Sequence, residues 1–137
     1  MRIARRALGA DALIEERDLR EAVLPRCSAA VLLDVLLYLA PSDADQVMRK
    51  ATGALEPGGV LLMREPDART GWAFRLTQLS ARFDAAMRGN FATRLHYRSA
   101  AEWRAQLEGL GLRVESEPMS ERTPFANVLF TARKIRA

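Results

Sequence analysis

Two short apolar runs in the middle of the chain each end abruptly in charged residues. Ala29 to Leu33 is followed by Asp34, and Val60 to Met63 is followed by the charged cluster at 64–67. Apolar runs that flank one amphipathic helix are typical of a parallel βαβ unit whose strands are covered on both faces. Ligands bind such sheets beyond the carboxyl ends of the strands, so we expect function at the two charged clusters.

The intervening helix is predicted to begin at Pro41 and Ser42. Ser42 stands three residues before Asp45, which is the spacing of a capping box with a short acid in place of the usual Glu. Lys50 lies in the C-terminal half, where a cation suits the helix dipole. The helix should close before the Pro57-Gly58-Gly59 sequence. Its apolar positions share one face at helical spacing: Val47, Met48, Ala51 and Leu55.

The N-terminal part contains weaker signals. Residues 2–8 favour a helix that stops at Gly9, and Ala12 to Glu16 favours a short edge strand. Asp18 to Glu21 is a polar turn, and spacing alone makes Asp18 a turn or cap residue.

Two helices are predicted after the second apolar run. Large apolar residues recur every three or four positions over 72–87, which predicts a long helix whose aromatic stripe is core rather than a ligand site. The stretch from Phe91 to Arg98 is irregular. Ser99 and Glu102 form a capping box that opens another helix, which ends at Gly109 to Gly111. The apolar face of that helix holds Trp103, Leu107 and Leu110.

Two further strands are predicted at the C-terminus. Leu112 to Glu117 alternates apolar and polar residues, and Asn127 to Ala132 is mostly apolar. Too few residues join them for a crossover helix, so we expect an antiparallel pair. The predicted fold class is therefore α/β, with residues 1–137 forming a single domain whose mostly parallel sheet ends in an antiparallel hairpin.

Composition narrows the function classes. No apolar run approaches the roughly 20 residues that a membrane helix requires, so we interpret the chain as cytoplasmic. One cysteine, Cys27, and one histidine, His96, cannot form an internal disulfide or a zinc site, so no metal is expected. The net charge of +4 comes mainly from arginines that are spread along the chain, whereas nucleic-acid binding favours a clustered basic patch.

The order of elements and several short motifs resemble the C-terminal two thirds of a class I S-adenosylmethionine-dependent methyltransferase. That family has a Rossmann-like sheet that ends in a hairpin. The matching residues are Asp18 to Arg20, Leu32 to Leu39, Leu55 to Gly59, Arg64 to Asp67, and Thr123 to Val128. More narrowly, the sequence is similar to methyltransferases of bacterial aryl-polyene pigment clusters around Trp72, His96 to Arg98, and Thr123 to Asn127.

The resemblance implies S-adenosylmethionine as the cofactor. In that reading Asp18 accepts a hydrogen bond from the adenine amino group and Leu19 packs on the ring. The backbone around Asp34 and Val35 holds the donor near its reactive methyl. The acceptor is expected to be a small molecule, aromatic or polyketide-like.

The glycine-rich cofactor loop of that family has no counterpart here. The pair Gly58-Gly59 precedes a strand, whereas the loop requires a strand before it and a helix after it. About 60 residues, somewhat more than one βαβ unit, are therefore expected to be missing upstream. We expect either a misplaced start or an N-terminally truncated paralogue.

The resemblance also implies a substrate cleft, with the segments after the second strand forming a lid. The expected cleft residues are Leu36, Leu37, Tyr38, Arg64, Glu65, Asp67, Trp72 and Tyr97. His96 is the natural general base, because imidazole is the side chain that titrates near neutral pH.

Each of these residues has a simpler interpretation. Asp34 then only caps the turn after its strand, and Arg64 and Glu65 form a solvated ion pair. His96 is an incidental surface residue, and Tyr97 only contributes packing.

Three functions remain open. The first is a methyltransferase whose N-terminal part is absent from this chain. The second is a non-catalytic, methyltransferase-like module that pairs with a second copy or a partner chain through its incomplete sheet. The third is a basic nucleic-acid-binding domain, whose affinity would fall steeply with salt.

Overall fold

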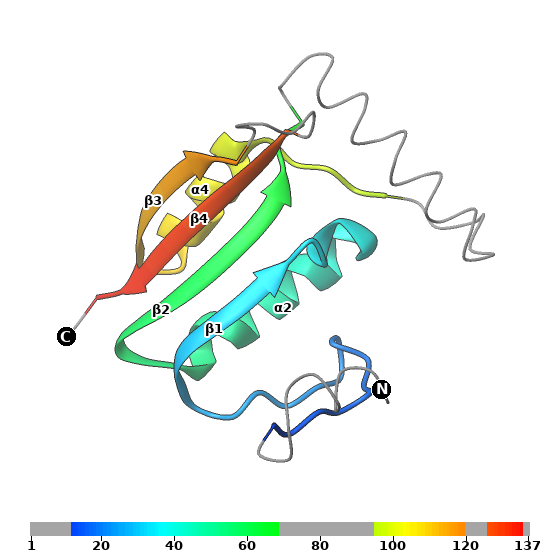
Figure 1. The fold of residues 1–137 in the computed structure, drawn as a ribbon, viewed down its shortest axis with the longest axis vertical. Helices are drawn as coiled ribbons and strands as arrows, with labels where there is room; N and C mark the ends of the chain where they lie inside the picture. The colour runs from blue at the N-terminus through cyan, green and yellow to red at the C-terminus, as the bar shows by residue number, and fades with distance from the viewer. Residues whose placement is uncertain (1–11, 69–94, 120–125, 136–137) are drawn as a thin grey trace.

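The computed structural model describes residues 12–68, 95–119 and 126–135. Along the chain these residues form β1 (Cys27–Leu33), η1 (Leu36–Tyr38), α2 (Pro41–Ala54), β2 (Leu55–Pro66), α4 (Ala100–Gly109), β3 (Leu112–Pro118) and β4 (Asn127–Lys134). The four strands form one sheet in the order β1-β2-β4-β3 (Figure 1). β1 and β2 are parallel, whereas β4 runs antiparallel to both of its neighbours. The predicted βαβ unit and C-terminal hairpin are therefore confirmed.

Both α2 and α4 lie on the same side of the sheet (Figure 1). Alternate strand residues point toward them, as the pleat of a strand requires. The core therefore sits between the two helices and this face of the sheet, and it includes Val47, Met48, Leu61, Met63, Trp103, Leu107, Leu112 and Phe130. Most residues of the two predicted apolar faces are buried, whereas Leu110 is only partly buried against the core; the buried ones are Val47, Met48, Ala51, Leu55, Trp103 and Leu107.

The two helices begin differently. At α4 the Ser99 side chain accepts from the Glu102 backbone N–H, and the Glu102 carboxylate accepts from the Ser99 N–H at 2.7 Å, so the predicted capping box is confirmed. At α2 the predicted box is wrong. Ala40 is the N-cap and makes no side-chain cap bond, because Pro41 already occupies the first turn and starts the helix before Ser42.

Two lysines fasten α2 to the rest of the chain. Lys50 donates to the backbone oxygens of Arg20 and Ala22, so it ties the segment before β1 to the helix. Lys134, from β4, donates to Thr52 O at 3.0 Å and Leu55 O at 2.8 Å. The cation at the C-terminal end of α2 is thus Lys134, where it complements the helix dipole.

The N-terminal segment departs from one expectation and fulfils another. Residues 12–16 form no strand, and Leu13 is 89% exposed, so the predicted edge strand at Ala12 to Glu16 is wrong. Three apolar residues with charged neighbours bury too little apolar surface to hold this segment against the sheet as a strand. The turn that starts at Asp18 is confirmed, because the Glu21 N–H donates to Asp18 O at 3.1 Å. The predicted helices over 2–8 and 72–87 lie outside the described residues.

Candidate functional site

Parallel strands β1 and β2 bring their charged ends to one edge of the sheet. Leu33 and Arg64 are register partners, and the Asp34 N–H donates to Arg64 O at 3.0 Å. Arg64 Nε also donates to Asp34 Oδ1 at 3.0 Å, and the Arg64 Nη2 contacts Asp34 Oδ2, so the pair is bidentate. Both side chains are about one-third exposed. The two predicted clusters therefore meet, as an ion pair that faces solvent.

Asp34 also turns the chain sharply after β1. Its φ is +53°, in the left-handed region that few residues other than Gly, Asn and Asp adopt. The next residues form η1, a single 3₁₀ turn. Asp34 is thus both a turn residue and the partner of Arg64.

Glu65 is separated from this ion pair by the pleat of β2. Successive strand residues point to opposite faces, so Arg64 faces Asp34 while Glu65 enters the core, where it is 1% exposed. The alternative of a solvated Arg64–Glu65 ion pair is therefore wrong. The Glu65 carboxylate instead accepts the Leu36 backbone N–H at 2.9 Å.

Burial changes the acid strength of Glu65. Desolvation of the carboxylate raises its pKa to about 7, and the negative charge of Asp34 acts in the same direction. Hydrogen bonds from the backbone of Leu36, Val35 and Leu37 oppose the rise. A strongly perturbed acid at a ligand-binding edge of the sheet is typical of a functional site.

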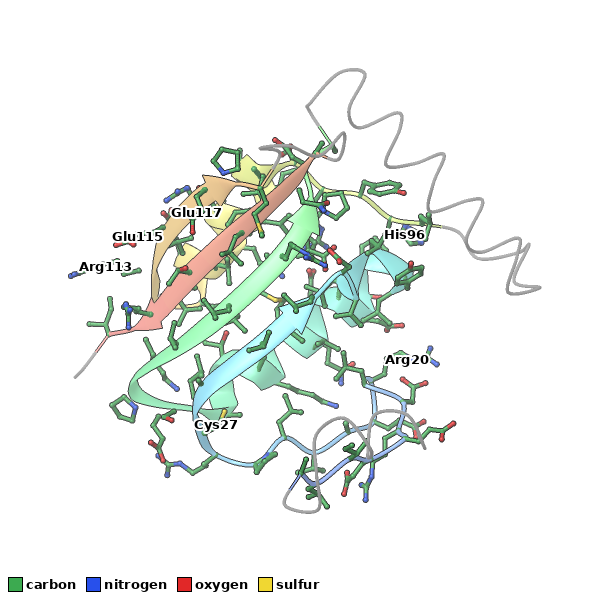
Figure 2. The ribbon with its side chains drawn as sticks, in the orientation of Figure 1. Arg20, Cys27, His96, Arg113, Glu115 and Glu117 are labelled. Atoms are coloured by element: carbon green, nitrogen blue, oxygen red, sulfur yellow. The ribbon has the colours of Figure 1, made fainter. Side chains whose placement is uncertain are left out.

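The segment before α4 packs against the same edge. His96 N–H donates to Leu37 O at 2.8 Å, and Ala68 N–H donates to Arg98 O at 3.2 Å. Figure 2 places His96 near the end of β1, far from Arg113, Glu115 and Glu117 on β3. The predicted general base is therefore brought to the site edge. Whether it acts as a base stays a prediction.

Asp67 joins three elements at the end of β2. Its N–H donates to Ala126 O at 2.7 Å, just before β4, and its Oδ1 accepts the Ala100 N–H at 3.1 Å, at the start of α4. This carboxylate therefore holds α4 and β4 at the site edge. Its predicted place in a substrate cleft remains a prediction.

The remaining predicted cleft residues differ in exposure. Leu36 and Leu37 are buried in the core, and Tyr38 is 46% exposed beside them. His96 and Tyr97 are half-buried. Trp72 lies outside the described residues. Of the η1 residues, only Tyr38 offers a large surface to a ligand.

The predicted adenine-binding turn lies beside the start of α2. Asp18 pairs with Arg20, whose Nη2 lies 2.6 Å from Asp18 Oδ2, and this interaction lowers the pKa of Asp18 to about 2. Arg20 Nη1 also lies 3.6 Å from Asp43 Oδ2, in the first turn of α2. Leu19 packs against the core. Asp18 thus presents an ionised acceptor near the helix that follows the Asp34 turn.

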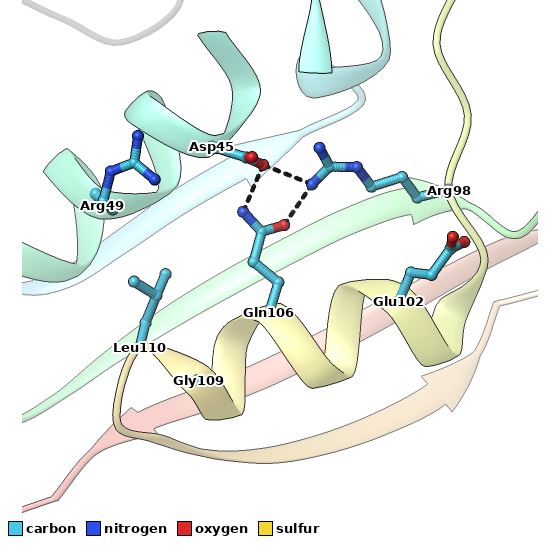
Figure 3. A pocket seen from close by; sticks show the side chains of 7 residues that line it. All are labelled: Asp45, Arg49, Arg98, Glu102, Gln106, Gly109 and Leu110. Carbon is cyan, nitrogen blue, oxygen red and sulfur yellow. Dashed lines mark hydrogen bonds and ion pairs between the residues drawn. The ribbon is translucent and has the colours of Figure 1, made fainter. Parts of the chain in front are cut away.

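A second polar cluster, which the sequence did not predict, lies between the two helices (Figure 3). Arg98 Nη1 donates to Asp45 Oδ1 at 2.7 Å and to Gln106 Oε1 at 2.6 Å, and Gln106 Nε2 donates to the same Asp45 oxygen at 2.8 Å. The guanidinium also stacks 4.8 Å from the Trp103 ring centroid. A groove of about 440 Å³ adjoins this Arg98 cluster. No local signal pairs Arg98 with a residue 53 positions away.

Within the described ranges, no three His, Cys, Asp or Glu side chains are grouped so as to hold a metal ion. None of the helices in these ranges combines the length and the apolar character of a membrane span.

No protein-family model matches the sequence, and no curated protein does. Solved structures do match. An O-methyltransferase family protein from Burkholderia thailandensis aligns over 99% of this chain and 40% of its own, with a TM-score of 0.69 and 23% identity. The chain has a methyltransferase fold.

Two further methyltransferases share this fold. Human N-acetylserotonin methyltransferase in complex with SAM has a TM-score of 0.65 and 20% identity over 88% of this chain and 33% of its own. Magnesium protoporphyrin IX methyltransferase from Synechocystis PCC 6803 with bound SAH has a TM-score of 0.69 and 17% identity over 97% of this chain and 57% of its own. The methyltransferase fold of this chain therefore spans between a third and three fifths of the length of these proteins. The predicted α/β fold class with its C-terminal antiparallel hairpin is confirmed, and the described strands form a mixed sheet with one parallel pair and two antiparallel pairs.

Proposed function

We propose that the chain forms part of an S-adenosylmethionine-dependent methyltransferase that acts on a small-molecule acceptor. The observation that carries this proposal is the polar edge of the sheet, where the Asp34–Arg64 pair and the buried Glu65 shape the turn after β1. Ligands bind open α/β sheets at this edge. The methyltransferase fold, matched over nearly the whole chain, supplies the reaction class.

The described residues fit part of the cofactor. Asp18 stays ionised at neutral pH and is 38% exposed, so it can accept a hydrogen bond from the adenine amino group beside Leu19. The backbone of Asp34 and Val35 would border the donor end. Gly59 is not a cofactor glycine, because a Cβ there would lie 2.9 Å from Glu56 O and 3.0 Å from Ser28 O, so it serves close backbone packing.

The remaining roles follow from the chemistry of methyl transfer. The sulfonium group of the cofactor already activates its methyl, so the protein aligns the acceptor, excludes water and removes a proton where the acceptor is a hydroxyl. We assign the proton removal to His96. Tyr38, Arg64 and Asp67 would border the acceptor, with Trp72 and Tyr97 closing over it. An aromatic or polyketide-like acceptor, as in aryl-polyene synthesis, suits these aromatic side chains.

Calorimetric titration of S-adenosylhomocysteine into the protein purified from its native host tests this proposal. We expect saturable binding that Asp18→Ala weakens at least tenfold, because one charge-assisted hydrogen bond is lost. Glu21→Ala, at another exposed acid of the same turn, is the matched control and should bind normally. Absence of binding would contradict the proposal.

A second candidate is an assembly module. The contrast between the two outer strands of the described sheet, β1 and β3, favours it. Among the described strands β1 pairs only with β2, and its sequence from Cys27 to Leu33 carries no charge. Val31 and Leu33 are 57% and 51% exposed. The opposite edge strand, β3, carries Arg113, Glu115 and Glu117, which discourage edge pairing. The uncharged outer strand β1 is therefore suited to pairing with a strand of a second copy of this chain or of a partner chain.

Sedimentation velocity tests the assembly module. A homodimer that Val31→Lys dissociates, while Thr131→Lys on β4 does not, would support pairing through β1. A monomer that binds S-adenosylhomocysteine would favour the enzyme instead.

A further inference from the structure

Glu65 is a buried acid that forms no ion pair with a cation of the described residues. Among the described residues no arginine or lysine forms an ion pair with it, because Arg64 faces the other side of β2 and binds Asp34. Its carboxylate accepts the Leu36 N–H at 2.9 Å, and the backbone of Val35 and Leu37 adds favourable interactions. Glu65 therefore interacts with the whole Val35–Leu37 turn through the backbone.

The turn has few other means of holding its shape. The 3₁₀ helix that it leads into, η1, contains only three residues, its N-cap Val35 makes no side-chain cap bond, and the turn follows Asp34 in the left-handed region. A single 3₁₀ turn has too few internal hydrogen bonds to be stable alone. The Glu65 carboxylate supplies the missing acceptor from β2.

The far side of the turn carries the segment before α4. Leu37 O accepts the His96 N–H at 2.8 Å, so the turn lies between Glu65 and the 95–99 segment. Movement of the turn would shift Asp34 at one end and the His96 backbone at the other.

We infer that Glu65 is a positioning residue, whose ionised carboxylate fixes the Val35–Leu37 turn and whose protonation loosens it. The effect of this positioning on catalysis rests on the proposed function, in which the turn borders the methyl donor and its Leu37 oxygen holds the backbone of His96, the general base. An ionised acceptor forms stronger hydrogen bonds with backbone N–H groups than a neutral one.

The surrounding charges place this protonation in the physiological range. Burial and the Asp34 charge raise the pKa of Glu65 to about 7. The Arg64 charge favours the ionised form, and His96 lies across the turn on the 95–99 segment. The turn is therefore held firmly above pH 7 and weakly below it.

The titration of the Leu36 amide tests this directly by NMR. In the unsubstituted chain we expect the Leu36 amide shift to follow a single step centred near pH 7, together with the Glu65 side-chain carboxyl carbon. Protection of that amide from exchange, corrected for the intrinsic rate, should be about tenfold higher at pH 8 than at pH 6. Glu65→Gln should abolish the step, whereas Glu56→Gln, at an exposed position near the start of β2, should keep it.

Three results would overturn the inference. One is a Glu65 carboxyl that titrates without the Leu36 amide, and another is a carboxyl that titrates near its ordinary value. Both are read from the unsubstituted chain, so they do not depend on the folding of a variant. A step that survives Glu65→Gln would belong to another group and not to Glu65. None of these measurements needs the cofactor, so a Leu36 step without S-adenosylhomocysteine binding would reject the proposed function and keep the inference.

Discussion

The two arginine–carboxylate clusters of this chain differ in how their charges are satisfied. In the Arg98 cluster between α2 and α4, each side chain finds a side-chain partner, and the guanidinium also stacks on Trp103. At the polar edge, Arg64 pairs with Asp34, but Glu65 lies in the core beside a left-handed Asp34, and within the described ranges its carboxylate meets backbone donors and no side-chain cation. The first arrangement fastens two helices. The second retains a backbone conformation and a buried acid that cost stability, and such costs cluster at functional sites.

The pH dependence of stability should separate the two clusters most strongly. The pKa of Glu65 is about 7 in the folded chain, above its ordinary 4.5, so the folded state binds this proton more tightly than the unfolded state. The stabilisation is therefore complete below about pH 4.5 and is lost as the pH rises through 7. Urea unfolding should show the contribution of Glu65 falling by about 3 kcal/mol between pH 4.5 and pH 8.

Glu65→Gln is the matched variant for that measurement. Its unfolding free energy should lack this fall, so the difference from the unsubstituted chain should change with pH. A constant difference across the range would show that Glu65 has the same pKa in the folded and unfolded states, which would contradict the raised pKa. A neutral Glu65 thus gives the folded chain a higher free energy of unfolding, whereas an ionised Glu65 forms stronger hydrogen bonds to the Val35–Leu37 turn.

Arg98→Ala should give the next largest effect, and one with little pH dependence. The variant removes the ion pair to Asp45, the bond to Gln106 and the stacking on Trp103. We expect urea unfolding to show a loss of about 2 kcal/mol at both pH 6 and pH 8. Arg49→Ala, on the exposed face of α2 beside the same groove, is the control. Equal losses in both variants would mean that the Arg98 contacts contribute nothing specific.

Substitutions of Asp34 should change the free energy of unfolding through both the backbone conformation and the charge of this residue. Asp34→Ala loses the Arg64 partner and places alanine at a φ of +53°, so we expect a loss of about 1–2 kcal/mol in thermal or urea unfolding. Asp34→Asn keeps a side chain that tolerates this conformation and should lose less than about 1 kcal/mol. If both variants lose the same amount, the left-handed turn carries no strain.

Ser99→Ala should have the smallest effect. It removes the side-chain acceptor of the α4 capping box, which costs about 1 kcal/mol in comparable helices. Ser42→Ala, within α2, should change the unfolding free energy by less than half of that, because Ser42 caps nothing. A larger loss for Ser42→Ala would restore the capping box that the sequence predicted there.

Local patterns predicted the elements of this fold well. Apolar runs predicted β1 and β2, and the Ser99–Glu102 spacing predicted the start of α4, because each depends on neighbours in sequence. The Ser42–Asp45 spacing was misleading, since Pro41 started the helix earlier and freed Asp45 for Arg98. Long-range side-chain pairing has no signature in a single sequence.

The candidate site was predicted in position but not in detail. Ligands bind parallel sheets beyond the carboxyl ends of the strands, so function was expected at the charged clusters that follow Leu33 and Met63. The pleat of β2 then decided that Arg64, and not Glu65, faces Asp34. The alternation of Leu61, Met63 and Glu65 on one face was visible in the sequence, and it is the signal that would have placed Glu65 in the core.

A map of amide shifts on addition of S-adenosylhomocysteine to the protein from its native host tests the proposed function at the level of single residues. The proposed function predicts that the largest changes fall on Asp18 and Leu19 and on Asp34 and Val35, with the Arg98 cluster unmoved. Saturable binding that shifts the Arg98 cluster and leaves the turn after β1 unchanged would contradict it.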